Sequence, residues 1–159
     1  MKINITLTKT EKEDLYSFFE FQLNKEARHL AAFVNKDSND KDAYVERYNT
    51  YLNNPTINMQ TIKVDNEIVG SISKFMMGDE AELTYWIDRK SWGKGIATSA
   101  LKDFLQMEKT RPIYGRTAFD NFSSQKVLEN CGFVKIGTDT GFANARQEEI
   151  EEYIYKRSS

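Results

Sequence analysis

The first segment of the chain alternates apolar and polar side chains over residues 3–7, which is the period of a β-strand. Shortly after this segment, Thr10-Glu11-Lys12-Glu13 have the pattern of a capping box, so a helix is expected to begin there with Thr10 as its cap. The side chains of this helix that share one face, and that we expect in the core, are Leu15, Phe18, Phe19 and Gln22.

Periodicity and turn residues predict the other elements in the same way. Asp65-Asn66 and Gly78-Asp79 are turn pairs with alternating apolar residues on either side, so three consecutive antiparallel strands are expected around them. Pro55 is expected to end the helix before these strands. In chain order the predicted elements are a loop at 35–42, a helix at 44–52, strands at 57–64, 68–75 and 83–87, a helix at 96–109, a strand at 113–118, a helix at 121–130 closed by Gly132, and strands at 133–136 and 150–155 joined by a polar loop at 137–149.

This order of elements is a mixed α/β plan. The predicted architecture is a single domain over residues 1–159, with a central, mixed but mostly antiparallel, twisted sheet flanked by helices. A chain of 159 residues can bury a core of its own without a metal or a disulfide to hold it together. No internal repeat or linker indicates a second domain.

Composition and charge exclude several classes of protein. The 22 basic and 24 acidic side chains give a net charge of −2, which offers no bulk attraction for a polyanion such as duplex DNA. No signal peptide or membrane span is expected. The single cysteine, Cys131, cannot form an intrachain disulfide and is expected to be a small buried apolar residue, and no zinc-ligand cluster is present. We therefore expect a cytoplasmic protein without a metal site.

The most informative window is Trp92-Gly93-Lys94-Gly95-Ile96-Ala97-Thr98, between a predicted strand and the first turn of a helix. Its glycines let a ligand approach the backbone closely, and the first amides of the helix lack an internal acceptor. Because these amides lie at the positive end of the helix, the window fits an anion such as a diphosphate. A tight turn that merely uses glycine for close packing is an alternative interpretation of the same residues.

Two other phosphate-binding motifs do not fit this window. A Walker A loop requires lysine after its last glycine, whereas Gly95 is followed by Ile96. The dinucleotide fingerprint requires a third glycine, and Thr98 occupies that position. Neither of these nucleotide-binding interpretations is therefore favoured.

Three stretches together resemble the GCN5-related N-acetyltransferases (GNAT), and within them the RimJ/RimL-like branch. Their order, their spacing and the predicted order of elements match that family along essentially the whole chain. The stretches are Ala81-Glu82-Leu83-Thr84-Tyr85-Trp86-Ile87, Trp92-Gly93-Lys94-Gly95-Ile96-Ala97, and the residues from Asp120 to Phe133. The resemblance implies an enzyme that transfers an acetyl group from acetyl-CoA to a primary amine, as a monomer or a homodimer.

The resemblance also implies where acetyl-CoA binds. Gly95 and Ala97 match the family loop, while Trp92 stands where Gln or Arg is usual. The backbone amides from Trp92 to Thr98, that is of Trp92, Gly93, Lys94, Gly95, Ile96, Ala97 and Thr98, would then hold the diphosphate. The charge of Lys94 could assist, although a solvated lysine is an equal alternative. Asn121 matches the residue that bonds to the pantetheine arm, and it is also a good helix cap.

The candidate catalytic residues follow from the same resemblance. Glu82 is expected to take the proton of the attacking amine. A backbone N–H near Trp86 or Ile87 would stabilise the oxyanion. Leu128 occupies the position of the usual tyrosine acid, which leaves Ser124, or a water, to protonate the departing thiolate. Each side chain also has a purely structural interpretation.

Some features remain open. His29, the only histidine, could orient or deprotonate an amine, although a solvated or structural role is more common for a lone histidine. A cationic acceptor could be attracted by an acidic run, Glu148, Glu149, Glu151 and Glu152. The residues that recognise the acceptor are expected in the first helices and in residues 137–149. A CoA-binding sensor or interaction module without chemistry is the alternative function.

Overall fold

The computed structural model describes residues 3–159, and the predicted elements are present together with an additional α-helix and a short 3-10 helix. The elements are β1 (Ile5–Lys9), α1 (Asp14–Phe21), α2 (Lys25–Ala31), α3 (Lys41–Leu52), β2 (Asn58–Val64), β3 (Glu67–Met77), β4 (Glu80–Ile87), the short 3-10 helix η1 (Arg89–Ser91), α4 (Ile96–Met107), β5 (Ile113–Ala118), α5 (Phe122–Asn130), β6 (Val134–Ala143) and β7 (Glu148–Arg157). Among these described residues, no helix has the length and apolar character that a membrane span needs.

Within residues 3–159, seven strands form one sheet in the order β1-β2-β3-β4-β5-β7-β6. The turn at Asp65 and Asn66, with φ of 51° and 70°, joins β2 to β3 as the hairpin signature predicts. Every neighbouring pair is antiparallel except β4 and β5, which run parallel. The predicted mixed, mostly antiparallel sheet is therefore confirmed.

The parallel pair β4 and β5 is joined over only part of its length. Residues 81–83 pair with residues 113–115, and no pairing continues toward the C-terminal ends of the two strands. Since β4 extends to Ile87 and β5 to Ala118, the sheet is split between these ends. The split leaves backbone and side chains of both strands available on its two sides.

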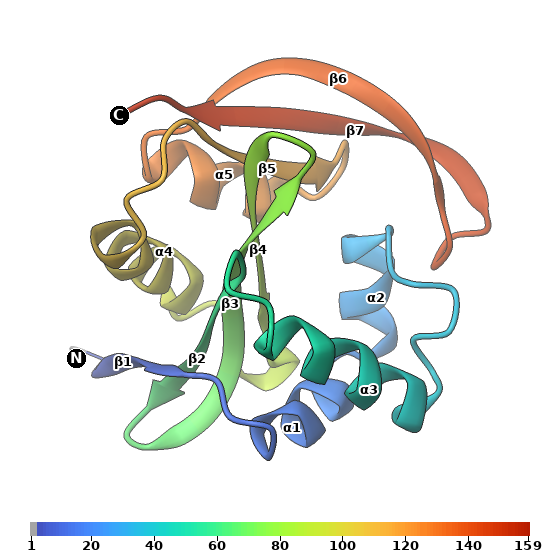
Figure 1. The fold of residues 1–159 in the computed structure, drawn as a ribbon. Helices are drawn as coiled ribbons and strands as arrows, with labels where there is room; N and C mark the ends of the chain where they lie inside the picture. The colour runs from blue at the N-terminus through green and yellow to red at the C-terminus, as the bar shows by residue number, and fades with distance from the viewer. Residues whose placement is uncertain (1–2) are drawn as a thin grey trace.

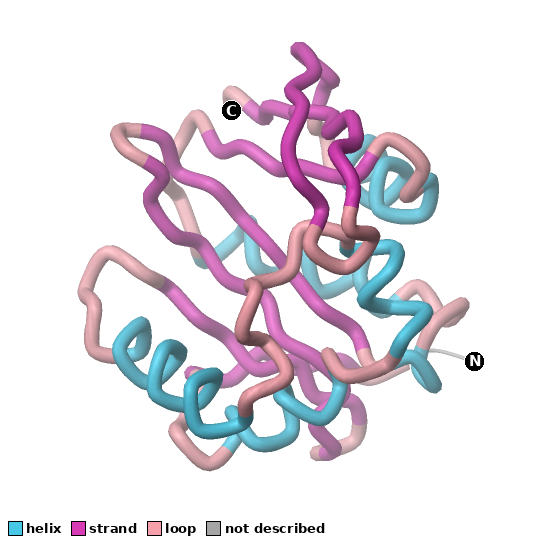
Figure 2. Tube along the Cα trace, turned by 90° about the vertical axis from the view of Figure 1, so that its right-hand side faces the viewer, coloured by secondary structure: helices cyan, strands magenta, loops and turns pink. Residues whose placement is uncertain are grey.

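Helices cover both faces of the sheet. Helices α4 and α5 lie on one face, and α1, α2 and α3 lie on the other (Figure 1). In Figure 2, which looks toward the face with α1 to α3, the strands run side by side behind helices and connecting loops. The core beneath α4 contains fully buried Ile72, Leu101 and Phe104, whereas Phe18 and Tyr44 belong to a separate cluster beneath α1 and α3.

The predicted cap of the first helix is wrong. Helix α1 begins at Asp14, and the hydroxyl of Thr10 instead bonds to the hydroxyl of Thr61 on β2 at 2.9 Å, where both side chains are buried. The carboxylate of Asp14 accepts the amide of Glu11 at 3.0 Å. The Thr10 hydroxyl, which the local pattern predicts as the helix cap, is therefore engaged in a tertiary contact with a residue 51 positions away.

The region before α3 and the region after α5 also differ from expectation. Helix α2, which carries His29, was not predicted as a separate helix, because its seven residues bury only Ala27 and lack an apolar stripe. The stretch 137–149 is not a loop for most of its length, since β6 and β7 pair from Val134–Lys156 to Ala143–Glu148. The strand could not be recognised from the sequence, because its Gly, Thr and Asp residues are mostly exposed and give no alternating apolar pattern.

The tip of the β6–β7 hairpin reaches back to α2, as the arch over the top and right of Figure 1 shows. The amide of Ala145 donates to the carbonyl of Ala32 at 3.1 Å. Arg146 makes two 2.8 Å bonds to the carboxylate of Asp120 and donates through Nε to the carbonyl of His29. The hairpin thus fixes α2 beside the segment that joins β5 to α5.

Candidate functional site

The loop between η1 and α4 has the backbone that the sequence predicts. Gly93 and Gly95 have φ of +79° and +74°, a region that L side chains rarely adopt. The space above each glycine is open to at least 4 Å around the position of a β-carbon. Gly95 is the N-cap of α4, so the loop presents bare backbone at the start of a twelve-residue helix.

The amides at the start of α4 have no acceptor within the helix. Its hydrogen-bond ladder begins with Ser99 N, which donates to Gly95 O at 3.1 Å, so the amides of Ile96, Ala97 and Thr98 precede the ladder. These N–H groups carry the partial positive charge of the helix terminus. Lys94 is exposed beside them. Open glycine backbone, free amides and an adjacent cation together are the features of a site for an anion.

Trp92 anchors this loop to the sheet. Its indole Nε1 donates to the carbonyl of Ile87 at the end of β4 at 2.9 Å, and the guanidinium of Arg89 lies 4.6 Å from the centre of the ring. Its own amide donates to Arg89 O at 3.2 Å, so the amides left for an anion begin at Gly93. The Trp92 side chain, which stands where Gln or Arg is usual, therefore holds the loop against the end of β4.

A cavity of about 390 Å³, here named the loop-side cavity, opens next to this loop. Its wall is formed by the loop, the end of β4, helix α2 and the start of α5. A second cavity of about 410 Å³, the sheet-side cavity, lies over β3, β4 and β5 beneath α1 and α3. Four polar or aromatic residues line both cavities, namely Tyr85, Trp86, Asn121 and Ser124. The two cavities therefore meet at the split between β4 and β5.

Ser124 lies at this meeting point and is paired with a tyrosine. The hydroxyl of Tyr85 on β4 donates to Ser124 Oγ on α5 at 2.8 Å. Burial raises the pKa of Tyr85 to about 12, with the bond to Ser124 opposing part of that rise. Alternation with Leu83 and Ile87 places Tyr85 on the strand, but no pattern in the sequence indicates its partner Ser124.

Asn121 caps α5 and ties it to α2. Its side-chain oxygen accepts the amide of Ser124 at 3.4 Å, and its Nδ2 donates to the carbonyl of Leu30 at 3.3 Å. Both ends of the amide are thus engaged within the protein, while the residue still lines both cavities. Its capping role, one of the two that the sequence indicates, is confirmed.

Glu82 lies in the sheet-side cavity with its side chain almost fully buried. The Nε of Arg116 on β5 contacts both carboxylate oxygens at 3.3 and 3.4 Å. Arg116 also contacts Glu152 on β7 at 3.2 Å and Asp139 on β6 at 3.6 Å. Burial raises the pKa of Glu82, and the nearby guanidinium opposes the rise. Glu82 is only 2% exposed, so it is not a solvated glutamate on the outer face of the strand.

The structure brings Glu82, Ser124, Asn121 and the glycine loop around the two cavities, but it separates other candidates from them. His29 is exposed and lines neither cavity. Cys131 is buried as expected, with its Sγ 3.7 Å from the carbonyl of Thr98, and burial raises the pKa of its thiol. Leu128, in contrast, lines the sheet-side cavity against Gly115, where it offers no hydroxyl. Within residues 3–159, no cluster of His, Cys, Asp and Glu side chains has the form of a metal site.

The chain is similar to one curated protein, the uncharacterized N-acetyltransferase p20 of Bacillus licheniformis. The two are 27% identical over 101 residues, which are 59% of this chain and 57% of that protein. The match therefore spans little more than half the length of the curated relative.

Solved acetyltransferases have the same fold. The microcin C7 self-immunity acetyltransferase MccE, in complex with acetyl-CoA and AMP, matches with a TM-score of 0.79 at 22% identity, over 98% of this chain and 92% of that one. RimL, a ribosomal L7/L12 α-N-protein acetyltransferase in complex with coenzyme A, gives 0.83 at 16% identity, over 99% and 98%. The spermidine N-acetyltransferase of Vibrio cholerae, in complex with CoA and spermine, gives 0.78 at 21% identity, over 94% of each chain.

These structural matches concern the fold, and a sequence profile adds the family. The profile described as the acetyltransferase (GNAT) domain matches residues 4–134, which include the glycine loop, β4 and all of α5. The same region contains the split between β4 and β5 and the residues that line both cavities. The chain therefore belongs to the GNAT acetyltransferase family.

Proposed function

We propose that the protein is an acetyl-CoA-dependent N-acetyltransferase that moves an acetyl group to a primary amine by direct attack in a ternary complex. The observation that carries this proposal is the meeting of two cavities at the split between β4 and β5. One cavity starts at the glycine loop before α4, whose free amides suit an anion, and the other contains the buried carboxylate of Glu82. Two ligands can thus approach one point from opposite sides of the sheet.

The proposed binding site for acetyl-CoA follows the loop-side cavity. The amides of residues 93–98 would hold the diphosphate, with Lys94 adding charge and Trp92 supporting the loop. Asn121 would contact the pantetheine arm from the wall that it shares with the other cavity. When bound, acetyl-CoA supplies a thioester carbonyl carbon to which the amine nitrogen bonds while the carbon–sulfur bond breaks.

Glu82 is the proposed base. A protonated amine must lose a proton to become a nucleophile. The ordinary pKa is about 10.4 for a lysine side chain and about 7.7–8.0 for a terminal amine. A buried carboxylate with a raised pKa is a stronger proton acceptor than an exposed one. Arg116 keeps the carboxylate in place at 3.3 Å. Glu82 would accept the amine proton, directly or through a water.

Ser124 is the proposed proton donor to the departing thiolate, and Tyr85 would support it. The Tyr85 hydroxyl points its hydrogen at Ser124 Oγ, which leaves the serine hydrogen free to donate elsewhere. A pKa of about 12 keeps the tyrosine protonated at neutral pH. The pair would thus supply the hydroxyl that Leu128 cannot supply from its position on α5.

The finer assignments belong to the same proposal. We place the chain in the RimJ/RimL-like branch, which is supported by the Trp92 loop and by the three matching stretches of sequence. We infer a cytoplasmic, monomeric or homodimeric protein in which residues 1–159 form one domain. The buried Leu128 favours a second candidate, a CoA-binding sensor or interaction module without chemistry.

Calorimetric titration with acetyl-CoA tests the proposal. Wild-type protein should bind at one site, and Gly95→Glu should abolish binding because its carboxylate would face the diphosphate. Gly78→Glu is the matched control, since Gly78 also has a positive φ and open space but lies in the β3–β4 turn. Release of CoA thiol with an amine separates an enzyme from a sensor. Equal loss of binding in both variants would refute the loop as the diphosphate site.

A further inference from the structure

The sheet-side cavity has walls that indicate the class of amine it accepts, an inference that rests on the proposed function. The floor of the cavity is the sheet face of β3, β4 and β5, and its roof is α1, α3 and the segment after α2. Most of the roof is aromatic. The aromatic residues of the roof are Phe18, Phe21, Phe33, Tyr44 and Tyr48, and the floor adds Phe75 on β3 and Tyr85 and Trp86 on β4.

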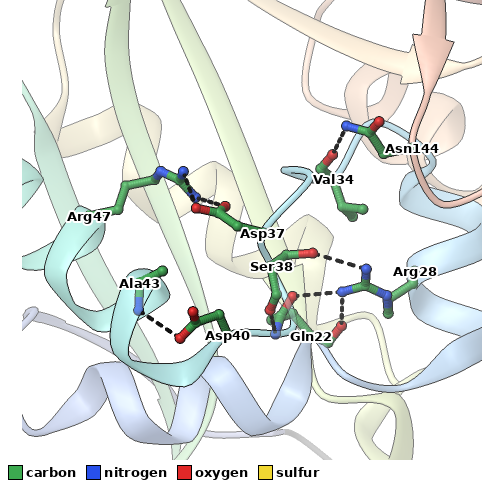
Figure 3. Close-up of polar contacts among 9 residues, drawn as sticks. All are labelled: Gln22, Arg28, Val34, Asp37, Ser38, Asp40, Ala43, Arg47 and Asn144. Atoms are coloured by element: carbon green, nitrogen blue, oxygen red, sulfur yellow. Dashed lines mark hydrogen bonds and ion pairs between the residues drawn. The ribbon is translucent and has the colours of Figure 1, made fainter.

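Three polar side chains in and next to the roof, Gln22, Arg28 and Ser38, are paired with one another. The side-chain amide of Gln22 donates to the carbonyls of Phe19 and Ser38 at 3.0 and 2.9 Å. Arg28 donates to Gln22 Oε1 at 3.0 Å and to Ser38 Oγ at 2.9 Å, as Figure 3 shows. Because these groups satisfy one another, they present little hydrogen-bonding capacity to a ligand.

The ionised side chains of the cavity wall lie together at its β5–β7 end. They are Glu82, Arg116 and Glu152, and the guanidinium bridges the two carboxylates. Asp139 is also within 3.6 Å of Arg116. This end is therefore net negative, and its cation is already surrounded by carboxylates. The aromatic groups Phe18 and Tyr44 lie toward the opposite end, where α1 and α3 pack above β2 and β3.

We propose that the acceptor is an arylalkylamine, a primary amine on a short apolar chain that ends in one aromatic ring. The amine lies at the Glu82 end, and the ring lies among the aromatic side chains of α1, α3 and β3. Phe75 is the direct cross-strand partner of Glu82, so apolar surface begins next to the carboxylate. A cavity of about 410 Å³ is of the size that proteins use for small ligands.

The same walls disfavour other amines. An amino acid would bring a carboxylate to an end where Arg116 already contacts three carboxylates. A polyamine would place a second ammonium among rings, without a carboxylate to replace its hydration.

The test is a comparison of amines by release of CoA thiol at saturating acetyl-CoA. The panel contains 2-phenylethylamine, phenylalanine, n-butylamine, spermidine and a tripeptide with an N-terminal alanine. We expect kcat/KM for 2-phenylethylamine to exceed kcat/KM for every other amine of the panel by about 10-fold or more. The other amines either lack the aromatic ring or carry additional charged or polar groups.

A pair of variants connects this preference to the cavity. Phe75→Ala should lower kcat/KM for 2-phenylethylamine by about 10-fold and affect n-butylamine much less, because only the former places a ring against this wall. Phe142→Ala is the same truncation on an exposed side chain of β6 that does not line the cavity, and it should change neither value. Calorimetric binding of acetyl-CoA verifies that each variant is folded.

The outcomes separate the inference from the proposed function. Turnover of spermidine, phenylalanine or the peptide at or above the rate for 2-phenylethylamine would overturn the arylalkylamine class and leave an N-acetyltransferase. A protein that binds acetyl-CoA but releases no CoA thiol when 2-phenylethylamine is added would also overturn the arylalkylamine class. A folded protein that binds no acetyl-CoA would remove the proposed function and this inference together.

Discussion

The hydroxyl of Tyr85 donates to Ser124 Oγ at 2.8 Å, and this bond joins β4 to α5 where β4 and β5 have stopped pairing. The two residues are separated by 39 positions in the sequence. They line both the loop-side and the sheet-side cavity. A hydroxyl pair from a strand and a helix thus stands at the junction where Leu128 contributes only apolar surface.

Removal of either hydroxyl should slow the chemical step. We expect Ser124→Ala to lower kcat by about 100-fold, which is the lower range for loss of a general acid. Tyr85→Phe should have a smaller effect, because the serine hydroxyl remains. Steady-state kinetics and calorimetry should show acetyl-CoA affinity nearly unchanged in both. Tyr16→Phe, an exposed tyrosine of α1, is the control. A loss of affinity that matches the loss of kcat would argue for a binding role only.

The charge of Glu152 should set the pH range of activity. Glu82 must be ionised to accept a proton, so activity should rise with pH through its pKa, which burial raises. Glu152 raises that pKa further through its charge and shares Arg116. Glu152→Gln should therefore move the acidic limb of the kcat/KM profile to lower pH. Glu149→Gln, exposed on the same strand, should leave it in place. A shift to higher pH would contradict this network.

Trp92 should affect binding of acetyl-CoA and spare the chemistry. Trp92→Phe removes the indole bond to the carbonyl of Ile87 and should loosen the loop by about 1 kcal/mol, the usual net value of such a bond. We expect KM and Kd for acetyl-CoA to rise by about fivefold, with kcat unchanged. A variant with normal affinity and reduced kcat would show that Trp92 acts in the reaction and not through the loop.

Asp120 should stabilise the folded state in a pH-dependent way. The bonds from Arg146 hold the pKa of Asp120 below its ordinary value of 3.8. A lowered pKa contributes stability that is present above the unfolded pKa and is lost as the pH falls through the folded pKa. Asp120→Asn should cost about 1 kcal/mol at pH 7, given the partial exposure of the pair.

Urea unfolding at pH 7 and near pH 3 measures this contribution. The difference between wild type and Asp120→Asn should shrink at the lower pH, because Asp120 is then mostly protonated in the unfolded chain and must lose that proton to keep its ion pair with Arg146. Asp37→Asn removes a more exposed pair with Arg47 and should have the smaller effect at pH 7. A constant difference across the pH range would show that the variant acts through packing and not through charge.

The sequence predicts the central elements of this fold because their signals are local. The turn pair Asp65-Asn66 has the positive φ values that its residue types favour, and the glycine loop occupies the start of α4. Glu82 could be selected as a candidate base because its strand resembles the corresponding stretch of the GNAT family. Its burial and its partner could not, because Arg116 lies 34 residues away and follows no local pattern.

The parts that the sequence does not predict depend on long-range contacts or on weak apolar patterns. Thr10 contacts Thr61 and does not cap α1. Helix α2 is held by Asn24 at its start and by Asn121 and the hairpin tip, and not by an apolar stripe of its own. Strand β6 has a largely exposed sequence, and its pairing with β7 alone defines it.

The wall shared by the two cavities has a consequence for how the substrates would compete or cooperate. Tyr85, Trp86, Asn121 and Ser124 face both sides, so a ligand that shifts any of them alters the surface that the other ligand meets. Any such coupling must be reciprocal in binding free energy. The order of substrate addition would then be a property of these four side chains, and the Kd for acetyl-CoA would itself report which amine occupies the opposite side.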